Sequence, residues 1–406
     1  MISEKIIVGE GTVYPLEGLL TLPETKGEKV PAVVFVHGSG AGNMDEQVYA
    51  LTPFRDLAEG LAARGVASIR YDKRTFTYGR QLRGQLITVE EETIEDAIRA
   101  AEVLRSDPRI DADAVFIVGH SMGAMLAPRI DAEGGAFRGL VLLAGTPLRL
   151  EDIVVRQLRQ AGKGKGGLMA AIVKLEDRIF SKKFYGLYEM SDEEAKKKKF
   201  AGGLTLYYFK EMGQKTAADY LLETDKPVLI LQGGKDFQVL PEEDFAAFRE
   251  QLKDRPAVEY RLYDELNHLF VKSVYNDILK AGKEYKLAQH IPGEVLDDIA
   301  SFVLQYSAAA PSADGRPESR VRYYEGLFDE LLSALSDPDA PQEKLRELSD
   351  KVGELERYLS GAEWKADFAA DESGLLPRDL KRGVLSEDGL WNALEDWRER
   401  IGGDED

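Results

Sequence analysis

The feature that most constrains the fold is an alternation of short β-branched runs with amphipathic helical stretches, from residue 30 to about residue 304. This order is typical of an α/β protein with a mostly parallel sheet covered by helices on both faces. Two earlier runs predict an antiparallel pair at one edge of that sheet. The predicted strands are 5–8, 19–22, 32–36, 67–71, 114–118, 140–144, 228–232 and 258–263, and the clearest helical intervals are 54–64, 92–105 and 242–252.

The alternation is broken in two places within the 406 residues. The interval from Thr146 to Pro227 is far longer than a crossover requires, which indicates an inserted helical cap. A later segment rich in Ala, Ser, Pro and Gly is typical of a linker, and apolar stripes at helical spacing follow it. The predicted division is 1–147 and 227–306 for the α/β core, 148–226 for the cap, 307–318 for the linker and 319–406 for a C-terminal helical domain.

Composition and charge exclude several classes of protein. The net charge is −19, and only the cap interval is mildly basic, with 16 basic against 12 acidic side chains. The phosphate backbone would be repelled by most of this surface, so we expect no nucleic-acid partner. Cysteine is absent, which excludes disulfides and thiolate sites and suits a reducing compartment. No signal peptide or run of ~20 apolar residues is found, so we expect a cytoplasmic protein without a membrane partner.

The strongest chemical motif is Gly119-His120-Ser121-Met122-Gly123, which follows a predicted strand and precedes a predicted helix. This is the G-x-S-x-G pattern of a nucleophile elbow, in the strand-to-helix context that the motif requires. The glycines allow the sharp, strained turn that lifts a serine hydroxyl above the sheet. Ser121 is therefore predicted to be a nucleophile, with the first amides of the following helix facing developing negative charge.

A serine nucleophile needs a base, and the chain has only four histidines. His120 lies inside the elbow and cannot turn back onto its neighbour, and His37 ends a strand and opens a glycine-rich loop. His290 precedes a C-terminal helix and is interpreted as structural. His268 follows the last predicted strand, where a base can close over the sheet edge, and it is the predicted general base.

The acid that orients this histidine is predicted to be Asp236, in a glycine turn just after a predicted strand. Asp264 and Glu265 are rivals close to His268 in sequence, but their position at a strand end indicates exposure to solvent. The resulting order is Ser121, Asp236, His268, and it is the chain order of one serine-hydrolase fold among several.

A tetrahedral intermediate also needs donors for its oxyanion. The loop His37-Gly38-Ser39-Gly40 follows the first central strand, and its small residues let backbone amides approach a ligand. We assign the oxyanion hole to the amides of Ser39 and Met122. The alternative is that the loop is only a tight turn.

Residues 1 to about 306 resemble bacterial serine esterases of the α/β-hydrolase superfamily in the blocks FVHGSG, RYDKRT, VGHSMGAMLAPRI, LQGGKDFQV and LNHLF. The resemblance implies the same roles for the triad and the oxyanion loop, and it implies that residues 71–74 line or support the pocket. A buried ion pair between Asp72 and Arg74 is the alternative for that stretch. The last hundred residues contain the blocks EWKAD and GLLPRDLKRGVLSEDGLW, and in these they resemble a bacterial accessory family of unknown function.

These observations predict a serine carboxylesterase that hydrolyses short-chain acyl or aryl esters of small molecules through an acyl-enzyme, without a metal or organic cofactor. Two alternatives stay open. One is a serine peptidase or amidase of the prolyl-oligopeptidase type, although no propeller precedes the hydrolase. The other is a partner-binding protein with a vestigial hydrolase. The basic cap suggests anionic substrates, and the C-terminal helices, with Trp364 and Trp397 expected on the surface, suggest a homodimer or a protein partner.

Overall fold

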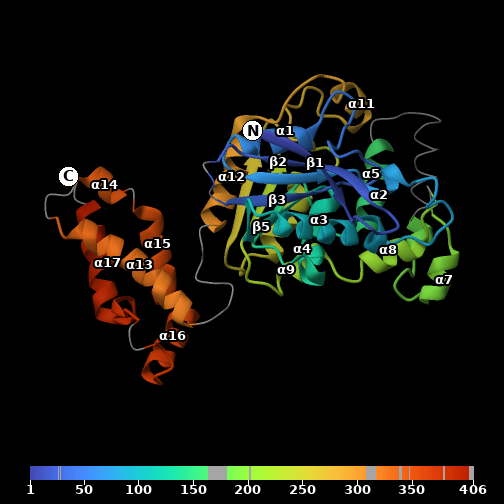
Figure 1. The fold of residues 1–406 in the computed structure, drawn as a ribbon. Helices are drawn as coiled ribbons and strands as arrows, with labels where there is room; N and C mark the ends of the chain where they lie inside the picture. Colours follow the sequence, from blue (N-terminus) through green and yellow to red (C-terminus); the bar gives the residue numbers. More distant parts are fainter. Residues whose placement is uncertain are drawn as a thin grey trace. The chain divides into compact units, whose positions relative to one another are not determined.

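The computed structural model describes residues 1–25, 27, 29–162, 181–200, 203–307, 317–337, 341–346, 348–377 and 380–401. The chain divides into two units, Met1–Ser307 and Ala308–Asp406 (Figure 1). The first unit holds the sheet, and the described part of the second unit is helical. The strands are β1 (Ile2–Val8), β2 (Leu16–Leu22), β3 (Val30–Val36), β4 (Ala67–Tyr71), β5 (Ile110–His120), β6 (Leu140–Leu143), β7 (Val228–Gly233) and β8 (Val258–Tyr263).

The eight strands form one sheet in the order β1-β2-β4-β3-β5-β6-β7-β8. Strands β3 to β8 pair in parallel, while β1 pairs antiparallel with β2 and β2 antiparallel with β4. The predicted α/β class with an antiparallel edge pair is therefore confirmed. Because the parallel strands share a direction, the loops that follow β3, β5, β7 and β8 gather at one edge of the sheet.

Helices cover both faces of the sheet, as continuous apolar strands require. Helix α1 begins at Pro53, a residue favoured in the first helical turn. Helix α9 begins after Thr216, which forms reciprocal capping contacts with Asp219. The helices of the first unit are α1 (Pro53–Ala62), α2 (Arg74–Thr77), α3 (Glu95–Ser106), α4 (Met122–Ile130), α5 (Leu150–Gly162), α7 (Asp192–Lys197), α8 (Leu206–Met212), α9 (Ala217–Leu221), α10 (Ala246–Gln251), α11 (Ala281–Glu284) and α12 (Gly293–Ser307).

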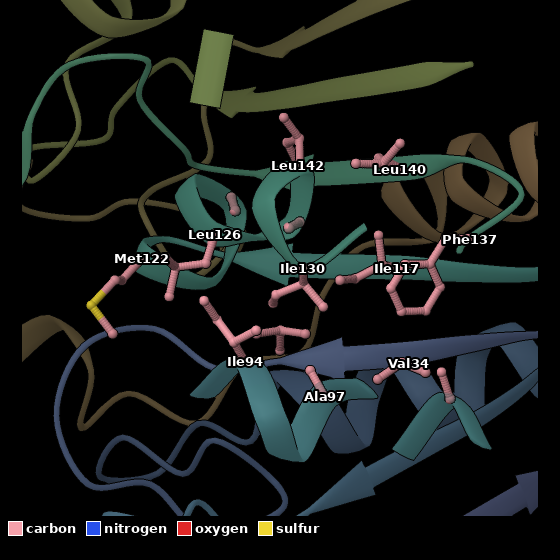
Figure 2. Close-up of a cluster of buried hydrophobic side chains, with 14 of the residues drawn as sticks. Val34, Ile94, Ala97, Ile117, Met122, Leu126, Ile130, Phe137, Leu140 and Leu142 are labelled. Carbon is pink, nitrogen blue, oxygen red and sulfur yellow. The ribbon is translucent and has the colours of Figure 1, made fainter. Parts of the chain in front are cut away.

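Two buried clusters fix the helices to the sheet. On one face, side chains of β3, β5 and β6 pack against α3 and α4, and Figure 2 shows Val34 and Ile117 of the sheet beside Ala97, Leu126 and Ile130. The opposite face packs on α1 and α12. The helix that follows the elbow serine is thus anchored along its apolar side, which holds its first turn at the sheet edge.

The long interval between β6 and β7 contains α5, α7, α8 and α9. We interpret it as the inserted cap predicted from the sequence. A helix expected at 167–180 lies wholly outside the described residues, as does all but residue 162 of a glycine–lysine turn expected at 162–167. The same is true of most of the predicted linker. No helix in the described ranges has the length and apolar character needed to cross a bilayer.

The second unit packs its helices around its own apolar cluster. Trp364 and Trp397 belong to this cluster, and their indole N–H groups donate to the carbonyls of Val384 and Leu345. The expectation that these two tryptophans are exposed is wrong, because each satisfies its polar atom inside the unit. The helices are α13 (Pro317–Leu335), α14 (Gln342–Arg346), α15 (Ser349–Ser360), α16 (Ala362–Glu372) and α17 (Glu387–Ile401).

Candidate active site

Ser121 lies in the sharp turn between β5 and α4. Its backbone has φ of 54° and ψ of −115°, in the region of positive φ that non-glycine residues rarely adopt. Its amide donates to the carbonyl of Leu143 at 2.9 Å, and its own carbonyl accepts from Ala124 and Met125 at 3.0 and 3.2 Å. The surrounding bonds therefore hold a strained turn in place, as functional sites often require.

The two glycines of the motif are obligatory for steric reasons. A Cβ on Gly119 would lie 2.3 Å from the carbonyl oxygen of Gly123, and a Cβ on Gly123 would lie 2.1 Å from the carbonyl oxygen of Val36. Both obstacles are backbone atoms that no rotamer change can move. The turn is thus packed between β3 and β5 too tightly for any side chain.

His268 and Asp236 meet Ser121 at the sheet edge. His268 lies in the loop after β8, and its Nε2 is 3.0 Å from Ser121 Oγ. Its Nδ1 is 2.8 Å from Asp236 Oδ2, in the loop after β7. The structure therefore brings together all three residues that the sequence proposed for a triad.

Asp236 is buried and accepts hydrogen bonds on both oxygens. The amides of Gln238 and Val239 donate to Oδ1 at 2.8 and 3.0 Å, and the Gln232 side chain donates to Oδ2 at 3.0 Å. Every other partner of this carboxyl is a donor, so the arrangement suits a carboxylate and also favours a proton on His268 Nδ1.

The rival residues are placed elsewhere. Asp264 and Glu265 are exposed. His290 has a largely exposed ring, with Nδ1 3.0 Å from Asp56 Oδ1. His37 is the buried first residue of the glycine loop, and its Nε2 is 3.0 Å from the carbonyl oxygen of Asn43.

The burial of His37 makes stability depend on pH. Burial is the largest influence and lowers its pKa from 6.5 to about 4, against the opposing charge of Glu46. A base with a depressed pKa stabilises the fold above its unfolded pKa, and that contribution is lost as the pH falls through 6.5 toward 4. Between pH 7.5 and 5 we expect wild type to lose about 2 kcal/mol more unfolding free energy than His37→Gln. Urea unfolding of both proteins at pH 7.5 and pH 5 measures this difference. An equal loss of unfolding free energy in wild type and in His37→Gln would contradict the prediction.

The glycine loop after β3 is held from several sides. Glu46 Oε1 accepts the amide of Gly38 at 2.7 Å, and Lys73 Nζ donates to the carbonyl of Gly38 at 2.9 Å. Among the described residues, no backbone carbonyl accepts the amide of Ser39. Ser39 and Met122 both line the same cavity as Ser121. Their amides are therefore available to a negatively charged oxygen at the serine.

A buried pair links this loop to the histidine loop. His120 Nδ1 lies 3.0 Å from Glu46 Oε2, and His120 Nε2 donates to the carbonyl of His268 at 2.9 Å. Burial opposes charge on His120, but the Glu46 carboxylate outweighs it and raises the pKa of the imidazole. Glu46 has no motif around it in the sequence, so only the fold shows that it joins the two loops.

The alternative of a buried ion pair between Asp72 and Arg74 is wrong. Arg74 pairs with Asp96 and Glu95 at the start of α3, at 2.6 and 2.8 Å. Asp72 Oδ1 accepts the amide of Met44 at 2.7 Å. The two side chains serve different elements, since Asp72 supports the glycine loop and Arg74 fixes a helix.

A cavity of about 400 Å³ lies over Ser121. This volume is within the range of small-molecule sites. Its lining is mostly apolar, and most of the apolar residues come from α4 and from the insertion. The apolar residues with large side chains are Met122, Met125, Leu150, Ile153, Val154, Phe200, Leu204, Phe209 and Val239, and the polar ones away from the serine include Thr75, Glu92, Gln157, Tyr208 and Gln238.

The lysine run at 196–199 does not supply a cationic lining. Lys196 pairs with Glu193 at 3.2 Å and Lys198 with Glu194 at 2.7 Å, within their own helical segment. Among the described lining residues of the cavity there is no lysine. The structure gives no support to the expectation that the basic cap selects anionic substrates.

Two family models and one curated relative match this chain. A family model described as an alpha/beta hydrolase family matches residues 33–275, and a domain of unknown function (DUF4298) matches residues 321–402. "Esterase EstD" of Thermotoga maritima is 33% identical over 294 residues, which are 72% of this chain and 66% of that protein. The match thus spans slightly less than two thirds of the relative.

Three solved structures are similar at lower identity. Est1E from Butyrivibrio proteoclasticus is 17% identical, with a TM-score of 0.47 over 75% of this chain and 99% of its own. The Pyrococcus furiosus esterase Pf2001 is 16% identical, with a TM-score of 0.46 over 76% of this chain and 92% of its own. A puromycin-hydrolysing peptidase of Mycobacterium tuberculosis is 18% identical, with a TM-score of 0.47 over 75% of this chain and 39% of its own.

Proposed function

Because the chain belongs to the alpha/beta hydrolase family, we propose that it is a serine carboxylesterase acting on small-molecule esters. The observation that carries the proposal is the continuous contact from Ser121 Oγ through the His268 imidazole to the Asp236 carboxylate, at 3.0 and 2.8 Å. The similarity to the Thermotoga maritima protein named Esterase EstD supports esters as the substrate class.

In the acylation step, Ser121 Oγ attacks the ester carbonyl carbon while His268 Nε2 accepts the hydroxyl proton. The carbonyl electrons move to the oxygen, which receives hydrogen bonds from the amides of Ser39 and Met122. The same imidazole then donates its proton to the leaving alkoxide as the carbon–oxygen bond breaks. An acyl-enzyme on Ser121 remains.

In the deacylation step, water takes the place of the alcohol. His268 Nε2 removes a proton from the water, the hydroxide adds to the acyl carbon, and Ser121 Oγ leaves as it regains the proton. Asp236 stays ionised throughout, and it holds the imidazole and stabilises the imidazolium of each step. The mostly apolar cavity would bind the acyl or aryl part of the substrate by excluding water from it.

The test compares esters with matched amides on the intact chain. We expect p-nitrophenyl esters from acetate to octanoate to be hydrolysed with an optimum chain length set by the cavity, and the matching p-nitroanilides to react far more slowly. Anilides hydrolysed as fast as the esters would favour the peptidase or amidase. No turnover of either series would favour the partner-binding protein with a vestigial hydrolase.

We further propose that the C-terminal helices support a homodimer. Large apolar side chains remain exposed on them, including Phe368 of α16 and Trp391 of α17, and burial of such surfaces drives association. We expect light scattering to give the mass of a dimer for the full chain and of a monomer for a chain ending at Ser307. A monomeric mass for both chains would contradict the proposal.

A further inference from the structure

Lys73 is a buried cation beside the glycine loop. Its side chain is 2% exposed, and its Nζ lies 2.7 Å from Glu92 Oε1 and 2.9 Å from the carbonyl oxygen of Gly38. Its backbone amide donates to the carbonyl of Gly42 at 3.0 Å. A buried lysine usually requires a paired charge, which Glu92 supplies. Charge pairing with Glu92 does not account for the second hydrogen bond, from Lys73 Nζ to the carbonyl oxygen of Gly38.

The carbonyl of Gly38 and the amide of Ser39 belong to one peptide group. That group is planar and trans, so its C=O and N–H bonds point in opposite directions and turn together. A bond that fixes the Gly38 oxygen therefore fixes the direction of the Ser39 N–H. Glu46 holds the preceding amide at 2.7 Å, so Gly38 is restrained on both sides.

The charge of Lys73 also acts on the strength of the donor. Amide resonance places negative charge on oxygen and positive charge on nitrogen. An ammonium bound to that oxygen favours this form, and linked hydrogen bonds polarise each other in a buried setting. The Ser39 N–H consequently becomes a better donor to an anion on its other side.

We propose that Lys73 is a positioning residue for the oxyanion hole, which orients and polarises the Gly38–Ser39 peptide so that the Ser39 amide stabilises the tetrahedral oxyanion. The inference deepens the proposed esterase function and rests on it. Lys73 itself does not touch the substrate.

The insertion completes this arrangement. The Tyr208 hydroxyl, on α8, donates to Glu92 Oε2 at 2.8 Å, so both oxygens of Glu92 are bound. Glu92 and Tyr208 line the cavity over Ser121. The pair of Lys73 and Glu92 is thus anchored to the wall of the substrate cavity as well as to the glycine loop.

A neighbouring ion pair provides a matched control. Arg74 follows Lys73 directly, is similarly buried and pairs with buried Asp96, yet it binds α3 and not the glycine loop. A general loss of buried charge would disturb both sites alike, whereas a role in positioning the peptide is specific to Lys73.

The experiment uses a trifluoromethyl ketone bound to the full chain. Ser121 Oγ bonds to the ketone carbon, the carbonyl electrons move to oxygen, and the serine proton passes to His268. Fluorine NMR then follows ionisation of the hemiketal hydroxyl with pH. For Lys73→Met, and for Lys73→Met with Glu92→Gln, we expect this pKa to rise by about one unit or more, and kcat on esters to fall about 10- to 100-fold with KM within about 3-fold.

The double variant leaves no unpaired carboxylate, so it tests the inference even if the single variant fails to fold. Arg74→Met with Asp96→Asn is expected to lower stability without moving the hemiketal pKa. An unmoved pKa in the double Lys73 variant, or an equal shift in the Arg74 control, would overturn the inference. If wild type forms no hemiketal and hydrolyses no ester, the proposed function itself fails and this inference falls with it.

Discussion

Replacing Ser121 by alanine is expected to lower kcat on p-nitrophenyl esters by a factor of about a thousand or more. The change removes the only hydroxyl that lies 3.0 Å from His268 Nε2 among the described contacts, so no acyl-enzyme can form. The Ser39 and Met122 amides and the cavity remain, and they should preserve substrate binding. Initial rates across the ester series, with active sites counted by a phosphonate label on wild type, provide the measurement.

Ser68→Ala is a suitable control for this change. Ser68 is fully buried on β4, and its hydroxyl has no hydrogen-bond partner among the described residues. Its replacement should leave both the fold and the turnover within about 3-fold of wild type, since the hydroxyl makes no bond to lose. Should Ser121→Ala retain turnover comparable to Ser68→Ala, another nucleophile would be responsible and the proposed mechanism would be wrong.

The sequence predicts the triad geometry because each member follows a parallel strand. Ser121, Asp236 and His268 come after β5, β7 and β8, and the register of those strands brings their ends to one edge. The glycine turn after a strand favours Asp236, and the exposed strand-end position of Asp264 and Glu265 disfavours these rivals. A strand-end position is thus a strong spatial constraint even when residues are more than a hundred positions apart.

The support around the site could not be predicted in the same way. Glu46, Lys73 and Glu92 lie on different segments, and nothing in their spacing indicates that Gly38 is bound from both sides. The fold decides such contacts by packing, not by local pattern. Packing also decides that Arg74 pairs with the more distant Asp96 and not with Asp72, the partner that proximity in sequence suggests.

The burial of the tryptophans in the second unit also depends on tertiary contacts that the sequence does not reveal. Trp364 and Trp397 fit both an exposed and a buried face of an amphipathic helix. The choice depends on carbonyl groups of Val384 and Leu345, which the tertiary structure brings within reach of each indole. Periodicity finds the helix, but only the partner elements determine which aromatic side chains satisfy their N–H inside the core.

Replacing Asp236 by asparagine is expected to lower kcat by a factor of about ten thousand, with a smaller effect on KM. Oδ1 faces the amides of Gln238 and Val239, while Oδ2 faces His268 and Gln232. An asparagine has only one oxygen, and the two backbone donors would take it. Its NH₂ would then face His268 Nδ1, which would have to become an acceptor and place the ring proton on Nε2. That tautomer cannot accept the proton of Ser121.

Asp131→Asn separates this effect from the general cost of losing a buried carboxylate. Asp131 is also buried, with Oδ1 accepting the amide of Phe137 at 2.7 Å and Lys226 Nζ at 2.8 Å, at the far end of α4 from Ser121. Its substitution should lower the unfolding free energy by about 1 to 3 kcal/mol and change kcat by less than about 3-fold. If the Asp236 variant kept more than a tenth of wild-type turnover, or if both variants lost turnover equally, the buried carboxylate would not be setting the tautomer of His268. The comparison therefore tests the role of Asp236 independently of its contribution to folding.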